Sequence, residues 1–298
     1  MESVLLGKSE TIRAVVITLL AGEHLLLEDV PGVGKTLAAK ALAGSIRATF
    51  SRIQFTPDLL PSDITGNTIY RSDTQDFQFN TGPIFANVVL ADEINRAPPR
   101  TQSALLEAMS DRQVSVDGTT YPLPSPFIVV ATQNPFEFAG TYVLPESQMD
   151  RFLMRTDIGY PALESERDVL QSHRGGEPVD SIESVVGVEE VVAAQEATRS
   201  VRFDETLEDY LLEIVTQTRT SGAFRLGVSP RASLSFYRGC QARAITERRD
   251  FVTPDDVKQL AVSTLSHRVL LDDYLGDSNR AAAEERMLEI LRRVPVPV

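Results

Sequence analysis

The sequence has few of the residues that build covalent or metal-bound frameworks. Cys240 is its only cysteine, which excludes an internal disulfide and a cysteine-based metal site. The histidines His24, His173 and His267 are too scattered along the sequence to indicate a zinc site. No apolar run approaches the roughly 18 residues of a membrane-spanning helix, and the longest candidate, Ala14–Leu20, follows no secretory layout. We therefore expect a cytoplasmic protein with no membrane insertion.

Positive charge is also scarce. The 298 residues include 29 Lys and Arg against 42 Asp and Glu, which gives a formal net charge of −13. This balance argues against broad, sequence-independent binding to nucleic acid or anionic membranes, but it does not exclude a local basic pocket. Lysine is the rarer cation, found only at Lys8, Lys35, Lys40 and Lys258. A lysine that falls inside a motif therefore needs a specific explanation.

The two halves of the chain differ in their hydrophobic pattern. Residues 1–160 alternate short apolar runs with helix-forming segments, which predicts an α/β domain whose parallel strands are covered on both faces. The expected strands are His24–Glu28, Phe50–Phe55, Val88–Asp92, Phe127–Thr132 and Met154–Ile158, and the expected helices between them are Thr36–Gly44 and Arg100–Arg112. Residues 161–298 follow a helical period, with helices at Glu205–Thr218 and Ala281–Arg293 and a helix start at Thr253–Asp256. We expect two domains, 1–160 and 161–298.

A glycine-rich loop follows the first expected strand and opens a helix, which is the context of a phosphate-binding loop. Gly32 and Gly34 allow backbone N–H groups to turn toward an anion at the positive end of the helix. Lys35 would reach the β- and γ-phosphates, and the Thr36 hydroxyl would hold Mg²⁺. Asp29 departs from the usual pattern, which has glycine at that position. The alternative is a glycine-rich turn with a helix-capping threonine and a surface lysine.

Polar side chains end the next expected strands. Asp92 and Glu93 close an apolar strand, where two acids have no packing purpose, and they suit Mg²⁺ coordination and activation of a water molecule. Asn134 follows the fourth strand and could orient that water; the alternatives are solvated acids and an Asn-Pro turn. Arg231 stands at a helix start, where the helix dipole disfavours a cation and a nearby phosphate would explain it.

Five motifs, in order along nearly the whole chain, resemble those of the AAA+ ATPases and more narrowly the MoxR family. They are LLLEDVPGVGKT, LADEINRAPPRTQSALLEAM, ATQNP, LPESQMDRF and GVSPRA. The resemblance implies an AAA+ core with a parallel five-stranded sheet of order 5-1-4-3-2 and a small all-helical lid domain.

The same resemblance implies roles for individual residues. ATP would contact the loop and the acidic strand end through Pro31, Gly32, Val33, Gly34, Lys35, Thr36, Leu37 and Asp92, and Mg²⁺ would be held by Thr36 and Asp92. Glu93 matches the water-activating acid, Asn134 the first sensor and Arg231 the second sensor. Arg151 matches the finger that completes a neighbouring subunit's site, with Arg155 as the alternative finger. Arg96 and Arg100 would face the subunit interface.

Two insertions interrupt the sheet pattern, near 66–80 and 113–122. The first resembles the family's helix-2 insertion hairpin, with arms at Thr68–Tyr70 and Phe77–Phe79. The second has an Asp117–Gly118 turn typical of a β-hairpin. In related ATPases such a hairpin points into a ring pore, and the alternative is that both are ordinary surface hairpins.

The predicted function is Mg²⁺-dependent ATP hydrolysis by a homo-oligomeric ring, expected to be a hexamer. The resemblance implies chaperone-like remodelling or maturation of a client protein, often beside a partner with a von Willebrand factor A domain. Three alternatives stay open: a DNA-remodelling motor, a magnesium-chelatase-like subunit, and a nucleotide switch with little turnover. The net charge argues against the first, and the complete set of acids and sensors argues against the last.

Overall fold

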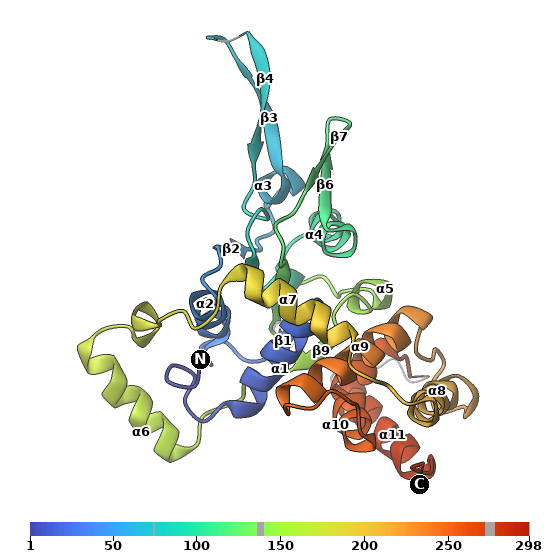
Figure 1. The fold of residues 1–298 in the computed structure, drawn as a ribbon. Coiled ribbons are helices and arrows are strands. Elements are labelled where there is room, and N and C mark those ends of the chain that lie inside the picture. The colour runs from blue at the N-terminus through green and yellow to red at the C-terminus, as the bar shows by residue number, and fades with distance from the viewer. Residues whose placement is uncertain (74, 136–139, 272–277, 298) are drawn as a thin grey trace. The chain divides into compact units, whose positions relative to one another are not determined.

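The computed structural model describes residues 1–73, 75–135, 140–271 and 278–297 (Figure 1). Contacts divide the chain into two compact units. The first consists of Met1–Ile12, His24–Leu144 and Asp157–Val192, and the second of Arg13–Glu23, Pro145–Thr156 and Ala193–Val298. The domain boundary expected at residue 160 stays a prediction.

In the described part of the chain, strands and helices are interspersed up to residue 156, and helices and 3₁₀ turns follow. The strands are β1 Leu25–Glu28, β2 Phe50–Gln54, β3 Gly66–Arg71, β4 Asp76–Thr81, β5 Val88–Asp92, β6 Gln113–Val116, β7 Thr119–Pro122, β8 Ile128–Gln133 and β9 Met154–Thr156. The α-helices are α1 Ser9–Ala21, α2 Lys35–Ser45, α3 Pro61–Thr65, α4 Pro99–Asp111, α5 Glu146–Met149, α6 Leu163–Ser172, α7 Val188–Arg199, α8 Glu205–Thr220, α9 Pro230–Thr246, α10 Pro254–Leu265 and α11 Ser278–Arg293. Short 3₁₀ turns are η1 Ile94–Arg96, η2 His173–Gly175, η3 Pro178–Ser181 and η4 Ser266–Arg268.

The five-stranded sheet has the order β2-β5-β8-β1-β9, which confirms the predicted order 5-1-4-3-2. The pairs β2/β5, β5/β8 and β1/β8 are parallel. Every residue of β1 and β5 is buried, as expected for strands covered on both faces. Because parallel strands end at the same edge of a sheet, the polar residues that follow β1, β5 and β8 are brought to one edge.

Both predicted hairpins are present (Figure 1). β3 pairs with β4 in antiparallel register, and β6 pairs with β7 around a turn whose residues Asp117 and Gly118 have φ of 51° and 80°. The Phe79 ring stacks on the Tyr121 ring at a centroid distance of 4.1 Å, so the two hairpins contact each other. Gly66 is required at the base of the first hairpin because a Cβ there would lie 2.2 Å from the Asn80 carbonyl oxygen.

His24 links the amino end of β1 to two other elements of the first unit. Its buried imidazole accepts a hydrogen bond from the Val129 N–H at Nδ1 (3.0 Å) and donates from Nε2 to the Met109 carbonyl (3.0 Å). This pairing uses the neutral ring, and burial lowers the pKa of His24 from 6.5 to about 4 despite the hydrogen bond to Met109. His24 therefore binds a proton more readily in the unfolded chain than in the folded protein.

We expect the first unit to lose stability as the pH falls from about 6.5 to about 4. Since the folded pKa is the lower one, the contribution is complete above pH 6.5 and disappears progressively below it, by about 3 kcal/mol in total. Urea unfolding at several pH values measures this loss. His24→Gln keeps a donor for the Met109 carbonyl. This variant is expected to be less stable at pH 7.5, but its free energy of unfolding should change less across this pH range. An equally steep profile in that variant would show that other groups cause the loss.

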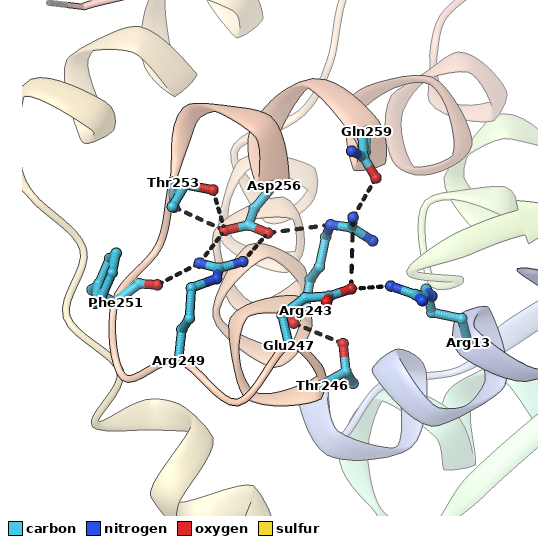
Figure 2. Close-up of polar contacts among 9 residues, drawn as sticks. All are labelled: Arg13, Arg243, Thr246, Glu247, Arg249, Phe251, Thr253, Asp256 and Gln259. Carbon is cyan, nitrogen blue, oxygen red and sulfur yellow. Dashed lines mark hydrogen bonds and ion pairs between the residues drawn. The ribbon is translucent and has the colours of Figure 1, made fainter.

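In the second unit, α10 begins with the predicted capping residues. The Thr253 hydroxyl and N–H both donate to the Asp256 carboxylate, at 2.9 and 2.8 Å (Figure 2). Asp256 also accepts two hydrogen bonds from Arg249, at 2.9 and 2.7 Å, and lies 3.2 Å from Arg243 Nε. Burial opposes the charge, but the hydrogen bonds from Arg249 and Thr253 hold the pKa of Asp256 below its usual value. This group of residues fixes the start of α10 against the end of α9.

Across the described ranges, no helix combines the length and the apolar character that a bilayer crossing requires.

Candidate nucleotide site

The loop between β1 and α2 has the backbone conformation of an anion-binding turn. Gly32 and Gly34 have φ of 85° and 100°, a region that other residues seldom adopt. A Cβ at Gly32 would meet no atom within 4 Å, so glycine is favoured here by backbone conformation and not by space. α2 begins at Lys35, and its first N–H groups have no intrahelical acceptor. The loop therefore presents backbone donors and the positive helix end together.

Lys35 is held beneath this loop. Its ammonium donates to the carbonyl oxygens of Asp29 (2.6 Å) and Val30 (3.2 Å), and the residue is 9% exposed. One of the chain's four lysines therefore lies at the position where the sequence predicts a bound phosphate.

Asp29, the departure from the usual loop pattern, has a structural explanation. Its Oδ2 accepts hydrogen bonds from the backbone N–H groups of Ile158 (2.8 Å) and Gly159 (2.6 Å), and its Oδ1 accepts from the Val30 N–H (2.7 Å). Lys8 donates to the Gly159 carbonyl (2.9 Å) from the other side of the same segment. A carboxylate at this position therefore anchors the loop to residues 158–159, which a glycine could not do.

The two predicted acids lie at the carboxyl end of β5. Thr132 on the neighbouring β8 joins them, because its hydroxyl donates to Asp92 Oδ1 (2.7 Å) and accepts from the Glu93 N–H (2.8 Å). Arg52 on β2 donates to Asp92 Oδ2 from Nη2 (2.6 Å) and Nε (3.1 Å). Glu93, whose φ is 56°, accepts at Oε2 from Gln54 (3.0 Å) and Arg96 (3.0 Å). Both carboxylates are thus oriented by hydrogen bonds from neighbouring elements.

Sequence reasoning missed three members of this group: Arg52, Gln54 and Thr132. Arg52 and Gln54 stand two apart on β2, so their side chains share a face of the strand. A charged residue inside an expected strand of the sheet was the available signal. The pairing of β2 with β5, which makes Gln54 the neighbour of Asp92, is a tertiary fact that local pattern does not carry.

The remaining predicted residues divide between the two units. Asn134 is buried directly after β8, and its carbonyl oxygen accepts from Asn95 (3.4 Å). Arg96 pairs with Glu93, whereas Arg100 is exposed at the start of α4. Arg151 and Arg231 belong to the second unit, so their approach to the phosphate loop stays a prediction. Arg155 also belongs there, with its side chain 9% exposed and 3.6 Å from Glu284.

A cavity of about 550 Å³ opens over the loop within the first unit. Eight residues predicted for the site line it: Pro31, Gly32, Gly34, Lys35, Thr36, Leu37, Asp92 and Glu93. Further lining residues come from α2, β2 and the segment around η2 and η3: Lys40, Arg52, His173, Glu177, Val179 and Asp180.

The side chains that line this cavity have the chemistry needed to bind a polyphosphate together with Mg²⁺. Lys35, Lys40 and Arg52 supply positive charge, and the Thr36 hydroxyl and Asp92 carboxylate are the oxygen ligands that Mg²⁺ prefers. No cluster of three or more His, Cys, Asp or Glu suited to hold a metal occurs among the described residues.

Comparisons with known proteins agree with this geometry. The profile of the ATPase family associated with various cellular activities (AAA) matches residues 24–154, and that of the AAA lid domain matches residues 216–290. Chaperone MoxR1 of Mycobacterium tuberculosis is 40% identical to this chain, covering 99% of it and 80% of the relative. The chain belongs to the MoxR family of AAA+ ATPases.

One further relative and one solved structure are similar to this MoxR-family chain over nearly its whole length. Uncharacterized protein YeaC of Bacillus subtilis is 48% identical, over 99% of this chain and 92% of that protein. The crystal structure of a protein provisionally assigned as an ATPase, from Cytophaga hutchinsonii, is 38% identical with a TM-score of 0.90, covering 99% of this chain and 92% of that one. This MoxR-family protein is therefore an ATPase with an AAA core and an AAA lid.

Proposed function

We propose that this MoxR-family ATPase hydrolyses ATP with Mg²⁺ and uses the resulting motion to remodel or mature a client protein. The observation that carries the proposal is that Lys35, Thr36, Asp92 and Glu93 line one cavity. A phosphate chain, its metal and the attacking water need just these chemical groups.

In the proposed mechanism, the loop N–H groups and Lys35 bind the phosphates. Thr36 and Asp92 would hold Mg²⁺, which would neutralise charge on the phosphate oxygens. Glu93 takes a proton from the attacking water, and Asn134 orients that water. Arg231 contacts the nucleotide from the lid, and Arg151 reaches a neighbouring subunit's site. Hydrogen bonds from Gln54 and Arg96 hold the Glu93 carboxylate in place.

We further propose a cytoplasmic homo-oligomeric ring, with six subunits, that acts on a protein and pairs with a von Willebrand factor A domain protein. The name Chaperone MoxR1 of the Mycobacterium tuberculosis relative supports the chaperone-like role. The exposed large side chains on the β3–β4 hairpin, Ile69, Tyr70 and Phe77, suit contact with apolar protein surface better than with nucleic acid. Together with the net charge of −13, they favour this role over a DNA motor.

Lys35→Ala is expected to remove ATP binding. The substitution deletes a buried cation whose charge-assisted hydrogen bonds to phosphate are worth roughly 1.5–3 kcal/mol each, so the loss of two such bonds should lower affinity by at least about 100-fold. Titration with a fluorescent ATP analogue measures the dissociation constant, and circular dichroism verifies folding. Lys258→Ala removes a lysine on α10 and is the matched control, expected to bind normally. A folded Lys35→Ala protein with affinity within threefold of the original would overturn the assignment of the loop.

A further inference from the structure

Within the second unit, one buried guanidinium lies between the backbones that carry Arg151 and Arg231. Arg268 donates from Nη2 to the carbonyl of Phe152 (2.6 Å) and from Nη1 to the carbonyl of Ala232 (3.3 Å). Phe152 directly follows Arg151, and Ala232 directly follows Arg231. The Arg268 side chain is 1% exposed, so this contact is made out of reach of solvent.

Asp150 and Ser229 join the same two segments a second time. Asp150, which directly precedes Arg151, accepts a hydrogen bond at Oδ2 from the Ser229 hydroxyl (2.8 Å) and lies 3.6 Å from Arg268 Nε through Oδ1. The Ser229 hydroxyl also accepts from the Ala232 N–H (3.1 Å) and thereby caps the helix that presents Arg231. Both arginines are therefore flanked by residues of one connected group.

Arg268 is a buried charge, and its hydrogen bonds to two separate segments offset the free-energy cost of that burial. Burial lowers the pKa of Arg268 to about 10, with Asp150 and Glu23 raising it and Arg231 lowering it, so the group stays charged at neutral pH. A buried charge is costly unless it is paired and hydrogen-bonded. Its planar fork can reach two carbonyls from separate segments at once, which a lysine ammonium on a flexible stem does less well.

We propose that Asp150, Ser229 and Arg268 form a positioning clamp that fixes the backbones of Arg151 and Arg231 relative to each other. The arginine offered to a neighbouring subunit and the arginine that meets this subunit's own nucleotide then move as one body. The clamp rests on the roles proposed above for these two arginines. The clamp would therefore transmit a change at one nucleotide site to the site of the neighbouring subunit.

The second unit also contains a control for purely structural effects. The Asp256 group, with Arg249 and Arg243, is a buried ion-pair cluster at the opposite end of α9 (Figure 2). Arg231 and Arg243 are about 18 Å apart along the helix, at about 1.5 Å per residue. Asp256→Asn should therefore destabilise the unit without displacing Arg151 or Arg231.

The test compares ATP turnover, KM and thermal midpoint in Asp150→Asn, Ser229→Gly and Asp256→Asn. Glycine is tolerated at a helix start, so Ser229→Gly removes the bond to Asp150 with little loss of capping and carries the test if Asp150→Asn does not fold. We expect kcat to fall at least about 10-fold in the two clamp variants, because small displacements of an aligned group are costly, and to stay within twofold in Asp256→Asn. Normal kcat in a folded clamp variant, or an equal loss in Asp256→Asn, would overturn the clamp.

Mixed subunits test whether one clamp serves both arginines. Arg151→Ala subunits mixed with Glu93→Gln subunits should regain turnover, since the second kind supplies intact Arg151. Asp150→Asn subunits in the same mixture should regain less, because their own Arg231 remains displaced. Equal recovery would overturn the coupling and leave Asp150 acting on Arg151 alone. If the Arg151→Ala mixture itself shows no recovery, the proposed role of Arg151 fails, and the clamp fails with it.

Discussion

Replacing Glu93 with glutamine is expected to keep ATP binding and to lower turnover by about 10²- to 10⁴-fold. Glutamine preserves the size of the side chain and an oxygen that can accept from Gln54 or Arg96, so the surroundings of the site should hold their arrangement. It lacks the negative charge that draws a proton from water. Binding and chemistry should therefore separate in this variant, as they would not if Glu93 only shaped the cavity.

Steady-state phosphate release and nucleotide titration on the same preparation measure the two effects. Glu107→Gln, an exposed glutamate on α4, is the matched control and should behave as the original protein. Turnover within threefold of the original in folded Glu93→Gln protein would remove Glu93 as the base. Loss of both binding and turnover would instead indicate that the carboxylate supports the loop.

Strands β1, β5 and β8 were predictable because burial on both faces leaves continuous apolar runs. The expected runs at 24–28, 50–55, 88–92 and 127–132 correspond to β1, β2, β5 and β8 with ends displaced by at most one residue. The order of these strands is a different kind of information. It came from the resemblance of motifs, since apolar runs alone do not specify which strands are neighbours.

Within the site, the predictable residues are those that share a local pattern. Lys35 and Thr36 follow a loop that opens a helix, and Asp92 and Glu93 end an apolar strand. The residues that orient them were not predictable, because Arg52 and Thr132 meet Asp92 only after β2, β5 and β8 have paired. Asp29 illustrates the same limit, since the backbone N–H groups that donate to its carboxylate belong to residues 158–159, far along the chain.

Arg151→Ala is expected to lower turnover by about 10³- to 10⁵-fold, the effect of an arginine that neutralises charge on the transferred phosphoryl group. Binding of ATP should change little, because the loop and Lys35 belong to the subunit that holds the nucleotide. Arg155→Ala is the informative comparison, since the Arg155 side chain is buried beside Glu284 and its loss should act on thermal stability first. A larger loss of turnover in Arg155→Ala than in Arg151→Ala would reverse the assignment of the finger.

The location of the effect distinguishes a finger from a residue that serves its own subunit. An Arg151→Ala subunit keeps an intact nucleotide site of its own, with Lys35, Thr36, Asp92 and Glu93. A Glu93→Gln subunit lacks the base but keeps Arg151. If the arginine acts across the interface, the first kind of subunit becomes active when the second kind precedes it in the ring, so turnover should rise as the two inactive proteins are mixed. Phosphate release measured against the mixing ratio should pass through a maximum, with assembly of mixed rings verified by differently tagged subunits. A flat line near zero, with mixed rings present, would mean that Arg151 acts within its own subunit or not on the nucleotide.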